Sequence, residues 1–597
     1  RRVVSVAAPK LAALVASAVR SGDAAKDTGM AGDVSGDCID ILHLASSCHG
    51  DAMRPLADAV AGTLLEYVAS GGRAGGRKKA SACLAALGAA TGDDALLDRV
   101  ADAAMENLTP EAMGVKSDAD VAEMSARSAD AAAEYVALLG AAARASRGRF
   151  AKRAALAFPR LKALLTNCAS EATEGLRERC LATLETFAGA CAGASAEVRD
   201  ELWAAETIRV ALELCAYDPN VDADPIDPEE DSDAEDESRG GGDVSNNSGG
   251  ESEDGGYSDY SDYSDEEEDA DDASWKIRRG AAGLAGAIFA NPGARRGGEV
   301  TDAGELRRLA EAFARTAKTL ASRLDRERDE SVRLDAFASL EGVFRASADA
   351  EGALGDALRD AARAAAPIAA RRAARASEAT DKTTSAKTRK AAFATLRAVS
   401  EAVPGCLAAK ANANRSNSNS LLASLAPAVV RAIEGAKEPA TRVEALAFLR
   451  AALGDEANAD AAKAVAAQDG GRALESLVQA AAAAANEPYY KVAAEALRVG
   501  AASASAVALV PDKKRRVALA DALAKTALER VSANDQDQEV KEAAIAAAGA
   551  TLAALADAID DDSLAEESES KTSAALVRAL LERRGDAATR ERAADAL

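Results

Sequence analysis

Two cysteines and two histidines near the N-terminus have the side chains of a metal site. Cys38, His43, Cys48 and His49 lie close together in the sequence, and thiolate and imidazole groups are the usual ligands of zinc. The segment that contains them, CIDILHLASSCHG, is predicted to be one continuous helix. Offsets of 5, 10 and 11 residues do not converge on one point of a helix with 3.6 residues per turn. We therefore predict no metal site and ordinary packing or surface positions for all four residues.

A glycine-rich segment, Ser70 to Ser81 (SGGRAGGRKKAS), is weakly similar to a phosphate-binding loop. Such loops end in Gly-Lys-Ser or Gly-Lys-Thr and follow a strand. This segment lacks that ending, and no strand is predicted before it. We predict an inter-helix turn that leads into a helix from Lys78 to Leu87.

Carboxylates are concentrated in one acidic segment, Asp218 to Asp272. It contains 24 Asp or Glu and one Arg, so its net charge is −23 out of −25 for the whole chain. The remaining residues are therefore nearly neutral, and the acidic segment is predicted to be a disordered insertion. A solvated, disordered segment cannot preorganise an acid and a base. Because the chain also has only two histidines, we predict no catalytic residues, no cofactor, no small-molecule substrate and no enzymatic activity.

A compact basic cluster, Pro511 to Arg516 (PDKKRR), has two interpretations. In the first, it is a nuclear import signal or a partner contact. In the second, which the sequence favours, it is the charged start of a helix on a solvated face.

The elements that must position any site are predicted to be helices. Alanine makes up roughly a quarter of the chain, aromatic residues only 3%, and this composition favours helix outside the acidic segment. At 597 residues the chain is too long for one ordinary core. No segment is expected to span a membrane, and no signal peptide is predicted, because Arg1 to Val4 enter a helical pattern without an initiator Met. The eight cysteines form no CxxC motif, so we expect buried thiols and a soluble protein of the cytoplasm and nucleus.

One pattern recurs along the chain: a polar turn, then a Val, Ile, Leu or Thr beside Arg or Lys, then a helix with Ala and Leu on one face. Its copies begin at Gly175, Ser274, Glu330, Ala386, Ala440, Pro488, Gln538 and Ala588. From the second copy on, the basic residues are spaced about 50 apart, as in two-helix HEAT repeats. They are Arg278, Arg333, Arg389, Arg442, Lys491, Lys541 and Arg590. We expect each to bridge to an acidic or carbonyl group of the adjacent repeat.

The predicted fold is therefore an all-α HEAT-repeat α-solenoid with one long, disordered acidic insertion. HEAT repeats are expected over 1–217, the acidic loop over 218–273, and the same solenoid again over 274–597. Two further stretches, Lys410 to Ser420 and Ala376 to Ser385, are predicted to be polar loops between helices.

The sequence at the two ends of the insertion is the most specific feature. ELCAYDPN (Glu213 to Asn220) precedes the acidic segment and SWKIRRGAAGL (Ser274 to Leu284) follows it. This arrangement closely resembles the cullin-associated and neddylation-dissociated protein family, HEAT-repeat regulators of cullin–RING ubiquitin ligases. In that family a YDPN sequence enters an acidic loop that closes on an SWKVRRAA-like helix. Further matches in the same order are CIDIL (Cys38 on), GLRERCLATLETF (Gly175 on), SRLDRERDESVRLDAF (Ser322 on), NEPYYKVAAEAL (Asn486 on) and QEVKEAAIAAAG (Gln538 on).

The resemblance implies a non-enzymatic scaffold that binds the unneddylated form of a cullin and its RING-box subunit. Such a scaffold regulates the assembly and substrate-receptor exchange of SCF-type ubiquitin ligases. We expect a monomer that binds no nucleic acid and no membrane. The first one or two repeats and the C-terminal half of the family protein are not matched, so we expect the cullin-clasping part of the activity without the adaptor-ejecting part.

Individual contact residues do not follow from the resemblance. The family signature positions at the two boundaries are the candidates for partner binding: Tyr217, Asp218, Pro219, Asn220, Trp275, Lys276, Arg278 and Arg279. The acidic loop has three expected roles: to guard a basic cullin surface, to steer association, or to act as a spacer.

Two alternative functions remain. An importin-β-like nuclear transport receptor also stacks HEAT repeats and carries an acidic loop, and it would bind a small GTPase and basic cargo. The YDPN and SWKIRR boundaries argue against it. A transcription-associated HEAT scaffold is the other, because members of the resembled family have been linked to the TATA-binding protein.

Overall fold

A computed structural model describes ten segments of the chain. They are residues 2–21, 34–69, 74–217, 274–291, 302–378, 385–410, 419–454, 456–533, 537–556 and 573–574. The predicted acidic insertion and the last repeat motif, from Ala588, lie outside the described residues.

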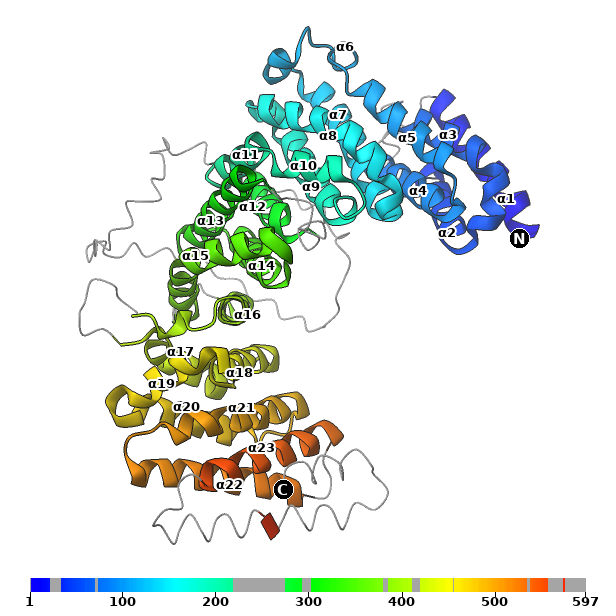
Figure 1. Cartoon of the computed structure of the whole chain (residues 1–597). Helices are drawn as coiled ribbons and strands as arrows, with labels where there is room; N and C mark the ends of the chain where they lie inside the picture. The colour runs from blue at the N-terminus through cyan, green and yellow to red at the C-terminus, as the bar shows by residue number, and fades with distance from the viewer. Residues whose placement is uncertain are drawn as a thin grey trace, which may run out of the picture.

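The described helices form two layers that follow each other along an arch, with α1 at one end and α22 and α23 at the other (Figure 1). The inner layer lines the concave side and consists of α2 (Val34–Met53), α4 (Ala74–Thr91), α7 (Ala126–Ser146), α9 (Glu174–Ala190), α12 (Ser274–Ala290), α14 (Glu330–Asp349), α16 (Ala386–Ala402), α18 (Pro439–Gly454), α21 (Tyr490–Ala508) and α23 (Gln538–Ala556).

The outer layer consists of α1 (Arg2–Ser21), α3 (Ala57–Ala69), α5 (Asp94–Asn107), α8 (Ala151–Asn167), α11 (Ala205–Cys215), α13 (Ala303–Arg326), α15 (Gly352–Glu378), α17 (Leu421–Gly435), α20 (Arg472–Ala484) and α22 (Lys513–Ser532). Three short helices, α6 (Pro110–Met113), α10 (Ala196–Trp203) and α19 (Ala459–Ala467), lie within the connections. The described part of the chain contains no strand beyond an isolated bridge between Lys410 and Ser420.

The predicted solenoid is confirmed by this arrangement. Each repeat motif that lies among the described residues opens an inner-layer helix, from α9 at the first motif to α23 at the seventh. Inner-layer neighbours pack against each other in sequence order, and each also packs against the outer helix of its own repeat. The apolar face that one helix pair cannot cover alone is therefore buried by the next pair, as stacked repeats require.

Helix starts follow from local sequence. The side-chain oxygen of the residue before the helix accepts a backbone N–H of the first turn at many outer and inner helices. These N-cap residues include Asp93, Ser125, Ser195, Asp302, Asp329, Ser385, Ser420 and Asp512. Each such cap stabilises its helix by about 1 kcal/mol.

The core combines many alanines with few large side chains. All nine phenylalanines are fully buried. Phe313 of α13 lies edge-on to Phe289 of α12 and to Phe344 of α14, with ring centroids 5.4 and 6.4 Å apart. Phe289 belongs to one repeat, and Phe313 and Phe344 belong to the next. The Phe289–Phe313 contact therefore joins the two repeats.

The inner helices α12 and α14 pack closely. A Cβ on Gly286 of α12 would lie only 2.5 Å from the Cβ of Ser339 on α14, so a side chain there would push the two helices apart. The array bends towards the inner layer, as Figure 1 shows.

Three predicted boundaries are wrong in detail. The helix expected over Lys78 to Leu87 is α4 and begins at Ala74, because Gly76 leaves room for the Tyr67 hydroxyl, which would lie 2.3 Å from a Cβ. The loop expected from Ala376 begins later, because α15 continues to Glu378 with Ala376 and Ser377 buried. The helix expected to be continuous through the histidines is interrupted at His49, where φ is −137° and ψ is 40°.

One helix of the described part, α1, is apolar and long enough, over Val3–Arg20, to cross a membrane by length and composition. This differs from the expectation that no segment has that character. In the array α1 has two apolar faces: one is buried and the other exposed. The buried face carries Ala8, Ala12 and Val15, and the exposed face carries Val3, Val6 and Leu14. On the neighbouring helix α2, Ile41 and Leu44 are likewise exposed.

Candidate interaction surface at the joint of the array

The two sides of the acidic insertion meet at Arg278. Its Nη1 donates a hydrogen bond to the Tyr217 carbonyl oxygen at 3.2 Å and another to Ser274 Oγ at 2.8 Å. Tyr217 lies two residues after the end of α11 at Cys215. Arg278 lies near the start of α12. The array therefore continues from α11 to α12 without a gap, because Tyr217 and Arg278, on the two sides of residues 218–273, are in direct contact.

The same guanidinium is neutralised by a glutamate of the next repeat. Arg278 Nε and Nη2 donate to the two carboxylate oxygens of Glu327 at 2.9 and 3.1 Å. Glu327 Oε1 also accepts the backbone N–H groups of Arg328 and Asp329. Arg278 is 9% and Glu327 6% exposed. A buried ion pair of this kind fixes the position of α12 relative to the end of α13, because either charge left buried alone would be strongly destabilising.

Tyr217 is fixed on its other side by α9. The Arg177 guanidinium lies over its ring, 5.0 Å from the centroid, and the Tyr217 hydroxyl donates to Glu174 Oε1 at 3.1 Å. Burial raises the pKa of Tyr217, and the hydrogen bond to Glu174 adds to the effect. The phenol is therefore a neutral hydrogen-bond donor around neutral pH.

A second charged group joins α12 to α14 beside the joint. Arg279 Nε of α12 donates to Asp335 Oδ2 of α14 at 2.7 Å. Beside this pair, the carboxyl group of Glu185 on α9 is surrounded by protein while part of the residue stays exposed, and its pKa is raised to about 7. Burial is the main cause and the Asp335 carboxylate adds to it, whereas Arg279 and Arg144 oppose it.

The structure thus brings together three of the signature residues, Tyr217, Arg278 and Arg279, and engages each in contacts within the array. Trp275 and Lys276 are half-buried on the first turn of α12, with the Lys276 ammonium 5.5 Å from the Trp275 ring centroid. The remaining signature residues, Asp218, Pro219 and Asn220, lie outside the described residues.

The predicted bridge from each repeat's basic residue is confirmed at two positions. Arg278 bonds to Glu327, and Arg442 Nη2 bonds to Glu487 Oε1 at 2.8 Å while its Nε donates to the Ile433 carbonyl. Arg333 has a buried Nε without a hydrogen-bond partner in the structure. Lys491 lies over the ring of Tyr490, and Arg590 is outside the described residues.

Other inter-repeat pairs were missed by sequence reasoning. They are Arg397–Glu444, Arg450–Glu495 and Arg498–Glu539, with N–O distances of 2.8, 2.5 and 2.7 Å. Each joins an inner helix to the next inner helix. A search for an acidic residue roughly one repeat length after each inner-helix arginine would include these partners, but among many other candidates.

The basic cluster of Pro511 to Arg516 is a helix start. Asp512 caps α22 and accepts the backbone N–H groups of Lys514 and Arg515. The Arg515 guanidinium donates to the Gly470 carbonyl and pairs with Glu475, and Arg516 donates to the Ala508 carbonyl. Only Lys513 and Lys514 of the four cations are exposed. This arrangement agrees with the favoured interpretation.

In the part of the chain that the structure describes, no group of three or more His, Cys, Asp or Glu side chains is placed to hold a metal. Seven cysteines are buried and Cys48 is exposed. Burial raises the pKa of the Cys83, Cys191 and Cys215 thiols to about 12, so these groups stay protonated.

An exposed aromatic pair at the start of α21 was not singled out from the sequence. Tyr489 and Tyr490 are 41% and 37% exposed, and their ring centroids are 5.7 Å apart. Aromatic side chains are enriched in protein interfaces, so these two add to the surface that a partner of the array can contact.

Known proteins similar to this chain include cullin-associated proteins. A family model described as "CAND1-like, TPR repeats" matches residues 417–548. The chain is 28% identical to "Cullin-associated NEDD8-dissociated protein 1" of Arabidopsis thaliana over 566 residues, which is 93% of this chain and 40% of that protein. It is 31% identical to "Cullin-associated NEDD8-dissociated protein 1, C-terminal part" of Emericella nidulans over 183 residues, 30% of this chain and 15% of that protein.

Solved structures give more distant similarities. Kap121p bound to Pho4p aligns with all of this chain and 55% of its own, at 12% identity and a TM-score of 0.44. An engineered protein, target OR497, aligns over 98% and 97% of the two chains at 13% identity and a TM-score of 0.41. The chain spans less than half the length of the Arabidopsis relative. The resemblance carried by the joint motifs is thus confirmed, and over nearly its whole length this chain is CAND1-like in sequence.

Proposed function

We propose that this chain is a non-enzymatic scaffold that binds unneddylated cullin–RING-box complexes along its concave face. In this role it regulates the assembly of SCF-type ubiquitin ligases and the exchange of their substrate receptors. The observation that carries the proposal is the collinear similarity, over 93% of the chain, to a protein named for its association with cullins.

The geometry supports this proposal at the joint. The motifs that identify the family in sequence are those that close the array between α11 and α12 through Arg278. The inner layer therefore runs unbroken past the point where the acidic insertion leaves it. A partner that follows the curvature of the arch contacts many repeats, each through a small area.

Within this proposal, the part assigned to these residues is the clasp of the cullin and RING-box subunit. The chain spans 40% of the length of the Arabidopsis relative. We further propose that it acts as a single copy in the cytoplasm and nucleus.

A pull-down tests the proposal. The chain is immobilised and presented with a purified cullin–RING-box complex, either unmodified or conjugated to Nedd8. We expect capture of the unmodified complex and little capture of the conjugate. Capture of neither form overturns the proposal, and equal capture of both overturns its selectivity. A GTP-loaded transport GTPase, tested on the same beads, separates the importin-β-like alternative.

A further inference from the structure

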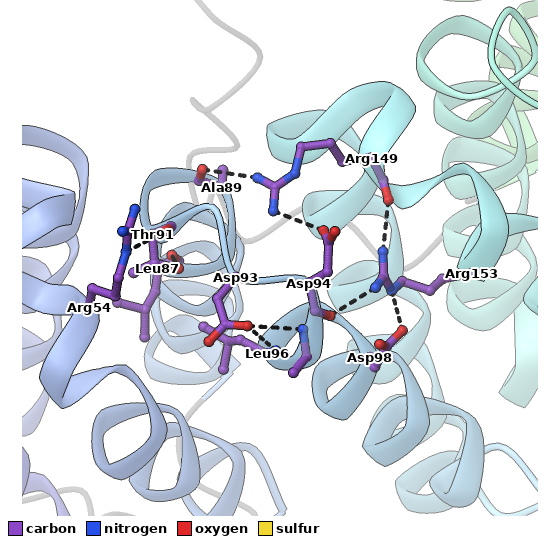
Figure 2. A network of polar contacts seen from close by, with 11 residues as sticks. Arg54, Leu87, Ala89, Thr91, Asp93, Asp94, Leu96, Asp98, Arg149 and Arg153 are labelled. Carbon is purple, nitrogen blue, oxygen red and sulfur yellow. Dashed lines mark hydrogen bonds and ion pairs between the residues drawn. The ribbon is translucent and has the colours of Figure 1, made fainter.

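The turn between α4 and α5 is held by arginines from the repeats on both sides (Figure 2). From the preceding repeat, Arg54 Nε donates to the Thr91 carbonyl at 2.9 Å. From the following repeat, Arg149 Nη1 donates to the Ala89 carbonyl and Nη2 to Asp94 Oδ1, at 3.4 and 3.0 Å. Three consecutive repeats therefore meet at this turn.

Arg153 adds the strongest of these contacts. Its Nε donates to Asp98 Oδ1 at 2.7 Å and its Nη2 to the Asp94 carbonyl at 2.8 Å. Its Nη1 donates to the Arg149 carbonyl at 2.7 Å, which fixes the two arginines relative to each other. The Arg153 side chain is only 10% exposed, whereas that of Asp98 is 59% exposed.

The charges match the helix ends that they contact. The carbonyls of Ala89 and Thr91 are at the C-terminus of α4, which has no further helical N–H partners and carries partial negative charge. Asp93 and Asp94 are at the N-terminus of α5, where partial positive charge favours carboxylates. Arginines at one helix end and aspartates at the other therefore surround the turn with matched charges, above the buried Leu97 side chain that packs on Gly88.

Apolar packing does not replace these contacts in the outer layer. α5 and α8 pack little against each other directly. In contrast, α13 and α15 pack along much of their length, through buried alanines such as Ala362, Ala366 and Ala369. The inner helices α4 and α7 do pack closely at the same junction. The outer side of this junction is therefore held largely by polar contacts. Arg149 and Arg153 hold the start of α5, and Arg160 Nε of α8 donates to the Leu108 carbonyl at its end, at 2.6 Å.

The turn that presents the arginines is itself strained. Arg147, at the end of α7, has φ 50° and ψ −130°, a conformation that non-glycine residues rarely adopt. The Cys191 thiol donates to its carbonyl oxygen at 3.7 Å, which anchors the turn to the end of α9. This conformation leads directly into the segment from which Arg149 and Arg153 extend to α5.

We propose that Arg149 and Arg153, with Asp94 and Asp98, form an ionic latch that sets the angle between the helices before α7 and the rest of the arch. With the latch closed, α5 and α8 are held together, and the distance across the concave face is fixed. When the latch opens, the two parts pivot about the α4–α7 contact and the width changes. The latch regulates the surface assigned under the proposed function, but the geometry that carries it does not depend on which partner binds.

The test measures the distance across the outer layer in the whole chain. Spin labels are placed at Glu66→Cys on α3 and Leu156→Cys on α8 in a Cys48→Ser background, since the other seven cysteines are buried and both sites are exposed. Double electron–electron resonance then gives the distance distribution. Raising the salt from about 0.1 M to about 1 M shortens the Debye length from about 10 Å to about 3 Å. We expect a narrow distribution that broadens and lengthens with salt.

The variant R149E/R153E should show the long, broad distribution at all salt concentrations, and adding D94R/D98R should restore the narrow one. Asp98→Asn, a milder change, should give an intermediate result if the double reversal does not fold. The matched control is Arg307→Glu, whose exposed pair with Glu311 lies within α13, and it should behave as the parent. A folded R149E/R153E variant with the parent distribution overturns the latch. Because no partner is present, a failed cullin pull-down contradicts the proposed function and leaves this result intact.

Discussion

Arg278 and Glu327 are 49 residues apart in sequence and share two hydrogen bonds across the boundary between consecutive repeats. Their side chains are 10% and 3% exposed. Arg278 also donates to the Tyr217 carbonyl, so the same residue fixes the end of α11 against α12. These contacts close the array between α11 and α12, which residues 218–273 separate in the sequence.

Arg278→Ala should destabilise the array by about 3–5 kcal/mol, because it leaves the Glu327 carboxylate buried without its cation. Urea denaturation measures the loss. Since repeat arrays unfold locally, hydrogen exchange should place the loss of protection in α11, α12 and the start of α14.

Arg307→Ala is the control for that experiment. Arg307 pairs with Glu311 one turn away, and both side chains are exposed, at 82% and 60%. Such pairs contribute at most about 1 kcal/mol. Equal effects of the two substitutions would show that the joint depends on apolar packing and not on the buried ion pair.

Glu185 should make stability depend on pH. Its pKa in the folded chain is raised from 4.5 to about 7, so folding holds its proton more tightly than the unfolded chain does. The stabilising contribution is full below about pH 4.5 and is lost as the pH rises through about 7. Glu185→Gln mimics the protonated form and should raise the melting temperature at pH 8 more than at pH 4.5. The same shift at both values would show that Glu185 titrates normally.

Cys48 should be the one thiol of the native chain that reacts rapidly with a maleimide at neutral pH. The other seven cysteines are buried, and burial raises the pKa of Cys168 to about 11 and of Cys406 to about 12. Mass spectrometry should count one adduct in the folded chain and eight in urea. Cys48→Ser should give none when folded. Labelling of any thiol in the folded variant would reveal an opening of the array near that cysteine.

Much of the fold could be predicted because HEAT packing is periodic. An apolar face with a basic residue recurs about every 50 residues, and that pattern located every described inner helix from α9 to α23. Helix ends were predicted less well. α4 begins at Ala74, before Lys78, and takes in Gly76, which packs against Tyr67 of α3. Glycines are typical of turns, so the sequence pattern placed this first part of the helix in the turn.

The contacts at the joint could be predicted only in part. The motifs on each side of the acidic segment marked Tyr217, Arg278 and Arg279 as candidates, but which atoms they contact depends on how adjacent repeats stack. Glu327 carried no signal of its own, since many glutamates lie at a similar spacing. For the same reason the Arg149 and Arg153 contacts to the α4–α5 turn could not be read from the sequence.

Replacing residues 222–272 with a short Gly-Ser linker should leave the melting temperature of the array unchanged. The contacts that hold the joint, from Arg278 to Tyr217, Ser274 and Glu327, all lie outside the deleted segment. The deletion removes most of the net negative charge of the chain. If the segment steers a basic partner, association with the unmodified cullin complex should slow at low salt while dissociation changes little. An unchanged association rate contradicts steering and favours a spacer, and a lowered melting temperature would mean that the segment stabilises the joint.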